Sequence, residues 1–192
     1  MARISSTQAE REAMRTVANL IATAARTAPK GRGVDEIRTM VIDDDDIEVL
    51  ARTMEEVAPG RPDIITNAFC RDAGNVRNSP YAVLIGILGV PKKPENPFDC
   101  GACGFRTCAN LLKAREKREV DGDFLGPVCA IASIDLGVAL GSAVKVAAEH
   151  NIDNRMMYTM GVAAAKLKWL DADIIMGIPL SVTGKSPYFD RG

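Results

Sequence analysis

The sequence of 192 residues has one histidine, one tryptophan and few aromatic residues, and its charges nearly cancel. It contains no Ser-His-Asp set and no paired catalytic carboxylates, so acid–base and hydrolytic chemistry lack their usual groups. Acidic and basic residues number 25 and 24. Bulk charge therefore predicts neither a nucleic-acid partner nor a membrane partner. Any catalytic or redox chemistry must therefore depend on other residue types, and the five cysteines are the strongest candidates.

The start of the chain has no apolar segment of the kind that opens a secretory signal peptide. The longest apolar stretch, residues 128–146, contains Asp135 and Lys145 and is rich in glycine and alanine. That composition fits a core helix better than a membrane span. We therefore expect a cytoplasmic protein whose 192 residues form one domain with a core that needs no staple.

Four of the five cysteines lie between positions 100 and 129, as Cys100, Cys103, Cys108 and Cys129. Glycine follows the first two, which lets the backbone fold tightly around one small centre, and the later cysteine can close the site from another element. One C-x2-C, a C-x4-C and a distant fourth thiol favour a [4Fe-4S] cluster over structural zinc, which usually uses two separate cysteine pairs. A zinc-stapled structural or interaction protein without redox activity is the alternative.

Cys129 has local support as a ligand. Gly126-Pro127-Val128-Cys129 reads as a loop followed by proline at the first helical position. A thiolate in the first helical turn gains about 0.3–1 kcal/mol from the helix dipole. The fifth cysteine, Cys70, lies outside this spacing, and we expect it to be a small buried hydrophobe.

The remaining pattern predicts alternating helices and strands. A capping box at residues 7–10 opens a long helix, an Asp run at 43–46 forms a polar loop that caps the next helix, and Asp153 and Asn154 cap a later one. Helices are expected near residues 7–28, 47–57, 64–70, 108–119, 128–149 and 156–167, and strands near 37–42, 81–90 and 172–179. The prolines after residue 90 lead to the cysteines, so residues 91–129 are read as an insertion within a single domain, 1–192.

The cysteine segment, residues 100–108 with Cys129, resembles the C-G-x-C-G-[FY]-x-[TG]-C pattern of a small iron-sulfur domain of anaerobic electron-transfer and corrinoid systems. The resemblance implies that all four cysteines are cluster ligands. Residues 25–32 resemble the A-P-S-x-x-N turn of flavin nitroreductases, residues 134–150 their long central helix, and residues 173–179 their late strand ending in G-x-P. Over nearly its full length the chain is similar to a family of uncharacterised bacterial and archaeal proteins with a ferredoxin domain.

These resemblances imply an α+β fold, a nitroreductase-like mixed sheet flanked by helices, with a cysteine-rich iron-sulfur insertion. They also imply a homodimer with FMN at the subunit interface. Its phosphate or ring edge would face Arg26, Lys30 and Arg32, together with Lys185 or Arg191.

The expected function is that of a [4Fe-4S] oxidoreductase or electron-transfer protein coupled to a flavin. It would exchange electrons with a redox partner protein or a small-molecule acceptor. No catalytic residue is identified. The basic stretch 113–118 is read as a solvated helix face or as a dock for an acidic electron donor.

Overall fold

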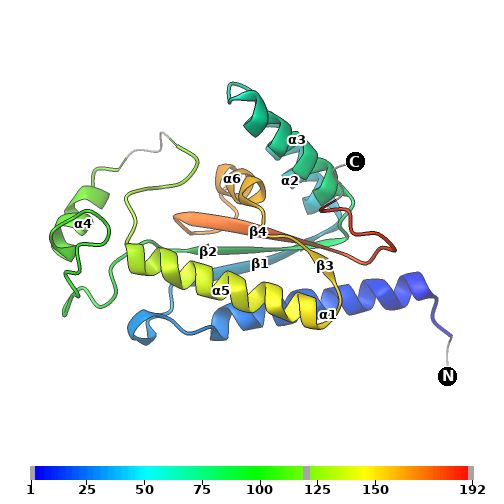
Figure 1. The fold of residues 1–192 in the computed structure, drawn as a ribbon, viewed down its shortest axis with the longest axis horizontal. Helices are drawn as coiled ribbons and strands as arrows, with labels where there is room; N and C mark the ends of the chain where they lie inside the picture. Colours follow the sequence, from blue (N-terminus) through cyan, green and yellow to red (C-terminus); the bar gives the residue numbers. More distant parts are fainter. Residues whose placement is uncertain (1–2, 119–121, 190–192) are drawn as a thin grey trace.

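A computed structural model describes residues 3–118 and 122–189. It shows a four-stranded antiparallel sheet in the order β1-β2-β4-β3, with helices on both faces (Figure 1). The strands are β1 (Ile37–Asp43), β2 (Tyr81–Ile87), β3 (Asp153–Asn154) and β4 (Ile174–Ser181). The helices are α1 (Ser6–Thr27), the short 3-10 turn η1 (Gly31–Gly33), α2 (Asp44–Glu56), α3 (Asp63–Arg77), α4 (Cys108–Arg115), α5 (Ala130–Glu149) and α6 (Tyr158–Lys166).

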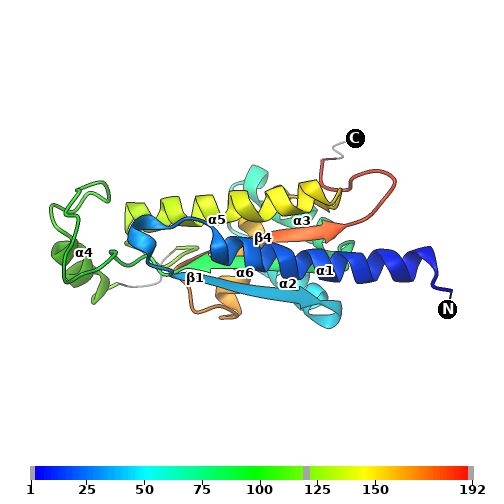
Figure 2. The same cartoon turned by 90° about the horizontal axis from the view of Figure 1, so that it is seen from below.

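The central strand β2 is buried at every position, because both of its faces are covered. Its odd-numbered residues, from Tyr81 to Ile87, belong to a core cluster with α1 and α5, while Ala82 and Leu84 belong to a second cluster with α2, α3 and α6. Helices α1 and α5 therefore cover one face of the sheet, and α2, α3 and α6 cover the other (Figures 1 and 2). The continuous apolar run in the sequence had predicted this two-sided burial.

Several helix starts differ from the sequence-based prediction. Ser5, two residues before the predicted capping Thr7, is the N-cap of α1, and its hydroxyl accepts a hydrogen bond from the Gln8 N–H at 3.2 Å. The Asp run does not form a loop, because Asp44 is already the first residue of α2. Its carboxylates stand in the first turn, where the helix dipole favours negative charge.

Two further predictions were wrong. Asp153 and Asn154 do not cap a helix; they form β3 and pair with Ser181 and Leu180, so α6 starts only at Tyr158. Cys70 lies on α3 and is exposed rather than buried.

Helix α5 is apolar almost all round, and only part of its surface is buried. Asp135, Leu136, Ala139 and Leu140 face the core, whereas Ile134 and Val138 remain 59% and 39% exposed. Within the described residues it is the one helix long and apolar enough to cross a membrane. A core helix of a soluble protein passes the same test, so this property is weak evidence for a membrane span.

The segment between β2 and α5 lies at one end of the sheet (Figure 1). It carries Cys100, Cys103 and Cys108, and Cys129 is its last residue. This is the end at which β1 starts, β2 ends and β4 starts, because Ile37 is paired with Ile87 and Ile87 with Ile174. Helix α4 is the segment's one helix among the described residues. It was predicted to reach Glu119, but it ends at Arg115, and Glu119 itself lies outside the described residues.

Candidate iron-sulfur site

Cys100 and Cys103 lie on the loop that precedes α4. Cys100 is exposed and Cys103 is half-buried against the core cluster of α1 and α5. Gly101 and Gly104 both have positive φ angles, +72° and +84°, which glycine adopts without strain. The Gly104 N–H donates to the Gly101 carbonyl at 2.9 Å, so a tight turn carries these two thiols.

Cys108 is the first residue of α4, where local structure holds it on two sides. The Asp99 carboxylate accepts a hydrogen bond from the Cys108 N–H at 2.6 Å, and Thr107 caps the helix through the Asn110 N–H at 3.2 Å. Burial raises the pKa of the Cys108 thiol; a hydrogen bond with the Asp99 backbone opposes this shift, whereas the Asp99 carboxylate and the charge of Cys129 add to it.

Cys129 is the N-cap of α5 and is only 6% exposed. We had expected Pro127 to open this helix and Cys129 to lie within its first turn, but the helix begins at Ala130. The reason is a tertiary contact: the Cys129 N–H donates to the Gly89 carbonyl at 2.8 Å, just beyond the end of β2. A side chain at Gly89 would collide with Val128, so glycine permits this close approach.

All five cysteines are free thiols. Within residues 3–118 and 122–189, no three cysteine, histidine or acidic side chains come close enough together to hold a metal ion. The structure thus brings the four predicted ligands to one end of the sheet without gathering them into a ligand set. The donor chemistry nevertheless fits an iron-sulfur cluster, because four uncommitted thiols are carried by a glycine-rich turn, a helix start and a helix N-cap.

A buried carboxylate, Asp173, anchors α4 and the segment around Cys129 to the sheet. It directly precedes β4, and its side chain is 2% exposed. It accepts hydrogen bonds from Arg115 at 2.7 Å, Arg118 at 2.8 Å and the Gly89 N–H at 2.6 Å, and Arg115 also donates to the Pro127 carbonyl at 2.7 Å. The sequence analysis missed Asp173. The two arginines three residues apart, at the end of α4 and just after it, were the available signal, but their spacing did not identify their partner.

A second buried carboxylate, Asp135, holds the other side of the segment. Its Oδ1 accepts the Gly31 N–H at 2.9 Å, and its Oδ2 lies 3.1 Å from the Lys92 ammonium, whose side chain is fully buried. Lys92 also donates to the Val34 carbonyl at 3.3 Å. These contacts make Asp135 a buried polar group with an ion-pair partner and a hydrogen-bond donor. They join η1, the loop after β2 and α5, and the role of Lys92 was not foreseen.

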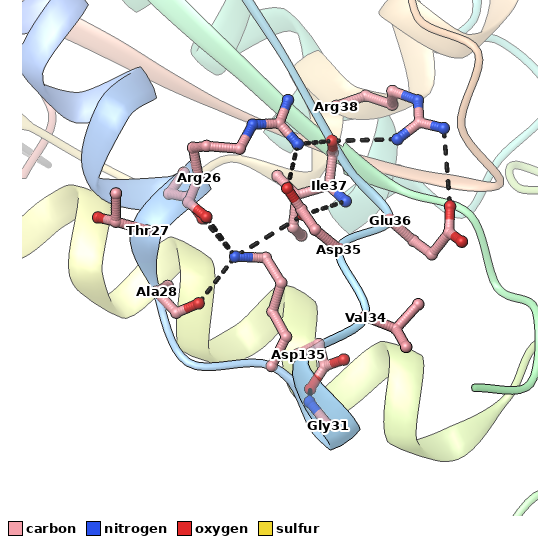
Figure 3. Close-up of polar contacts among 12 residues, drawn as sticks. Arg26, Thr27, Ala28, Gly31, Val34, Asp35, Glu36, Ile37, Arg38 and Asp135 are labelled. Carbon is pink, nitrogen blue, oxygen red and sulfur yellow. Dashed lines mark hydrogen bonds and ion pairs between the residues drawn. The ribbon is translucent and has the colours of Figure 1, made fainter. Parts of the chain in front are cut away.

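Arg26 and Lys30 are two of the predicted flavin contacts. Arg26 lies in the last turn of α1 (Figure 3), and Lys30 follows the end of that helix and donates back to it. Arg26 donates to Asp35 at 2.5 Å and to the Ile37 carbonyl at 2.7 Å. Lys30 donates to the carbonyls of Arg26 and Ala28 at 2.5 and 2.7 Å and so caps the helix. Burial alone would raise the pKa of Asp35, but the bonds from Arg26 and from the Ile37 N–H, with the charge of Lys30, lower it.

Arg32, the third predicted flavin contact, binds the loop that leads to the cysteines. Its guanidinium donates to the Asn96 carbonyl and stands 4.9 Å from the centre of the Phe98 ring. Lys185 follows β4 and therefore lies beyond the end of the sheet that is opposite to the cysteines. One chain thus does not bring Lys185 together with Arg26, Lys30 and Arg32 in a single site. Arg191 lies outside the described residues.

The other face of the sheet has a hollow of about 330 Å³ that the sequence did not suggest. Asp72 lies in its wall and accepts hydrogen bonds from Arg71 and, at 2.8 Å, from Thr159. The rest of the lining is mainly apolar and aromatic: Ile65, Ala68, Phe69, Arg155, Met156, Met157, Tyr158 and Met176.

The fold, with helices on both faces of an antiparallel sheet, is that of nitroreductases. A nitroreductase with bound FMN from Desulfitobacterium hafniense matches with a TM-score of 0.54 at 15% identity, covering 96% of this chain and 81% of that one. The FMN-dependent nitroreductase NfnB from Mycobacterium smegmatis matches with a TM-score of 0.53 at 12% identity, covering 90% and 78%. At such identities the likeness establishes the fold alone.

Sequence comparison defines the family. An uncharacterized protein from Archaeoglobus fulgidus is 48% identical over 180 residues, which cover 94% of this chain and 92% of the relative. Residues 125–191 match the family model described as "uncharacterized protein containing a ferredoxin domain". The chain belongs to this family, and the predictions of fold and family are confirmed.

Proposed function

We propose that the protein is an iron-sulfur redox protein whose [4Fe-4S] cluster is held by Cys100, Cys103, Cys108 and Cys129. The observation that carries the proposal is the delivery of four free thiols to one end of the sheet, where Cys103 packs against the core that contains Cys129. The ferredoxin domain in the family description supports the same chemistry.

The chain's own residues would position and shield the ligands. Asp173 fixes α4 and the Pro127 segment relative to the sheet, and Asp99 ties the Cys100 side of the loop to Cys108. Cys103 and Phe105 pack against the core that contains Cys129, which keeps water from that side. When bound, the cluster would supply one-electron transfer to a partner protein or a small-molecule acceptor.

Zinc is the competing occupant, because four thiolates also suit a tetrahedral zinc site. Anaerobic purification with assays of iron, sulfide and zinc on one sample separates the two. About four irons and four sulfides per chain, with a visible absorption that bleaches on reduction, are expected for the cluster. A colourless protein with one zinc per chain would overturn the redox proposal and leave a structural staple.

We also propose that FMN binds, which would make the protein a flavin-coupled oxidoreductase. The nitroreductase fold and the hollow between α3, α6 and β4 support this, because its aromatic wall and arginines suit a flat ring with an anionic tail. The hollow is not lined by Arg26, Lys30, Arg32 or Lys185, so the proposal offers two locations.

Fluorescence titration with FMN tests both locations. We expect saturable binding that weakens in Arg71→Gln if the hollow is used, and in Arg32→Gln if the predicted phosphate contacts are used. If the wild-type protein shows no saturable binding, the proposal that FMN binds is wrong.

A homodimer packed through α5 is the third part of the proposal. Ile134, Gly137, Val138 and Gly141 form an exposed stripe on this helix, in which the glycines let another helix approach closely. Light scattering should give the mass of a dimer for the wild-type protein and of a monomer for Val138→Glu. A monomeric wild-type protein would contradict this interface.

A further inference from the structure

The basic residues in α4 and in the turn that follows it have different surroundings. Arg115 and Arg118 both pair with the buried carboxylate of Asp173. Lys113, in α4, and Lys117, in the turn after it, are exposed, and no ion pair or side-chain hydrogen bond engages them within the described residues. The contacts within the fold therefore explain the positive charges of Arg115 and Arg118, but not those of Lys113 and Lys117.

A hollow of about 320 Å³ lies beside these two lysines. Its lining is Phe105, Asn110, Lys113, Ala114 and Lys117. Phe105 is half-buried and packs against the same core as Cys103 and Cys129, and the exposed Arg106 follows it in the chain. A cationic rim therefore surrounds an aromatic residue that is adjacent to the ligand loop.

We propose that the surface formed by α4 and its flanking residues, comprising Phe105, Arg106, Asn110, Lys113 and Lys117, docks an acidic electron-carrier protein. The proposal rests on the iron-sulfur function and names the class of its redox partner. The formal charge of the chain is −1, so the uncompensated positive charge here is local and would orient an acidic carrier as it approaches. Transient redox encounters use small interfaces, which fits a surface made of one short helix and its flanking residues.

The location also suits the electron transfer itself. A carrier on this face would lie over Phe105, next to Cys103 in the folded chain and before Cys108 in the sequence. In the step, the reduced carrier loses one electron and the iron-sulfur centre of the chain gains it, with no proton transferred and no covalent bond formed. The carrier is the reductant, and an acidic ferredoxin represents its class.

Stopped-flow reduction of the cluster-loaded protein by a reduced, acidic two-cluster ferredoxin tests the proposal. We expect a rate that falls as ionic strength rises, and a drop on the order of tenfold at low salt in Lys113→Glu/Lys117→Glu. The matched control Arg15→Glu/Arg52→Glu makes the same change in net charge on exposed residues of α1 and α2, and should stay within about twofold of the wild type. Equal rates for the two double variants, or a rate independent of salt, would overturn the docking face.

A calorimetric titration of the same samples with the oxidised ferredoxin needs no electron transfer. Binding at low salt that is lost only in the lysine variant supports the docking face. If the same protein loads zinc instead of iron, the iron-sulfur function fails but the docking face still stands. If the cluster loads but the lysine variant binds the ferredoxin as the wild type does, the docking face fails and the iron-sulfur function stands.

Discussion

The Asp173 carboxylate lies 2.7 Å from the Arg115 guanidinium, and the two side chains are 2% and 8% exposed. Arg115 is on the helix that begins at Cys108, and Asp173 directly precedes a strand of the sheet. The same carboxylate accepts the Gly89 N–H, and the Gly89 carbonyl accepts the N–H of Cys129. One buried anion thus sets Cys108 and Cys129 relative to each other before any cofactor binds.

Asp173→Asn should destabilise the protein strongly, because it leaves Arg115 buried without its counter-charge. Removing one partner of a buried ion pair costs about 3–5 kcal/mol of the free energy of unfolding. Urea unfolding of the metal-free protein measures the loss. The exposed Asp171→Asn, two residues earlier, is the control and should change stability by less than about 0.5 kcal/mol. Similar values for the two variants would refute the anchoring role.

The Lys92–Asp135 pair should behave as a coupled unit. Asp135→Asn leaves a fully buried ammonium without an anion, and we expect a loss of about 3–5 kcal/mol. Adding Lys92→Met should recover part of that loss, since the uncompensated charge is removed. A double-mutant cycle based on denaturant unfolding measures the coupling. Strictly additive losses would show that the two side chains act independently.

Gly161→Ala should destabilise the packing of α6 on the sheet. A Cβ atom at Gly161 would lie 1.7 Å from the Ile175 carbonyl oxygen, and a strand backbone cannot easily move away. We expect a loss of about 1–3 kcal/mol or more from overpacking. Gly74→Ala, in α3, would place its Cβ in open space and should stabilise the protein by about 0.5–1 kcal/mol. Thermal unfolding of both variants should therefore give shifts of opposite sign, and equal shifts would contradict the packing described.

Alkaline pH should destabilise the protein partly through Tyr188. Burial raises the pKa of its phenol to about 12, while in the unfolded chain a tyrosine ionises near pH 10. Folding thus favours the neutral phenol, and this contribution is complete below about pH 10 and lost as the pH rises toward about 12. Tyr188→Phe should lose less stability than the wild type over this window in urea unfolding. An identical pH dependence in the two proteins would contradict the buried, neutral phenol.

Much of the fold could be predicted from local sequence patterns. The apolar run that starts at Tyr81 gave the central strand, and the small-residue helix ending at Glu149 was found with its correct C-terminal end. The errors arose where tertiary contacts override local preferences. Asp153 and Asn154 are good helix caps, but pairing with β4 makes them a strand.

The site was predictable only as far as the spacing of its cysteines allowed. The four thiols could be identified from the sequence because three of them lie within nine residues. Arg115 and Asp173 are 58 residues apart, and no local sequence pattern indicates that they form an ion pair. The resemblance to nitroreductases implied a phosphate contact for Lys30. Its capping of α1 could not be predicted, because it depends on where the chain turns after the helix.

The central claim is that Cys100, Cys103, Cys108 and Cys129 hold one iron-sulfur cluster. It is tested most directly by iron and sulfide content after anaerobic reconstitution of Cys129→Ser and Cys70→Ser, measured beside the wild type. Cys129 is the proposed ligand farthest along the chain, and Cys70 is an exposed thiol on α3. The account predicts about four irons per chain in the wild type and in Cys70→Ser, and a large loss with an altered spectrum in Cys129→Ser. Full iron content and an unchanged spectrum in Cys129→Ser would contradict it.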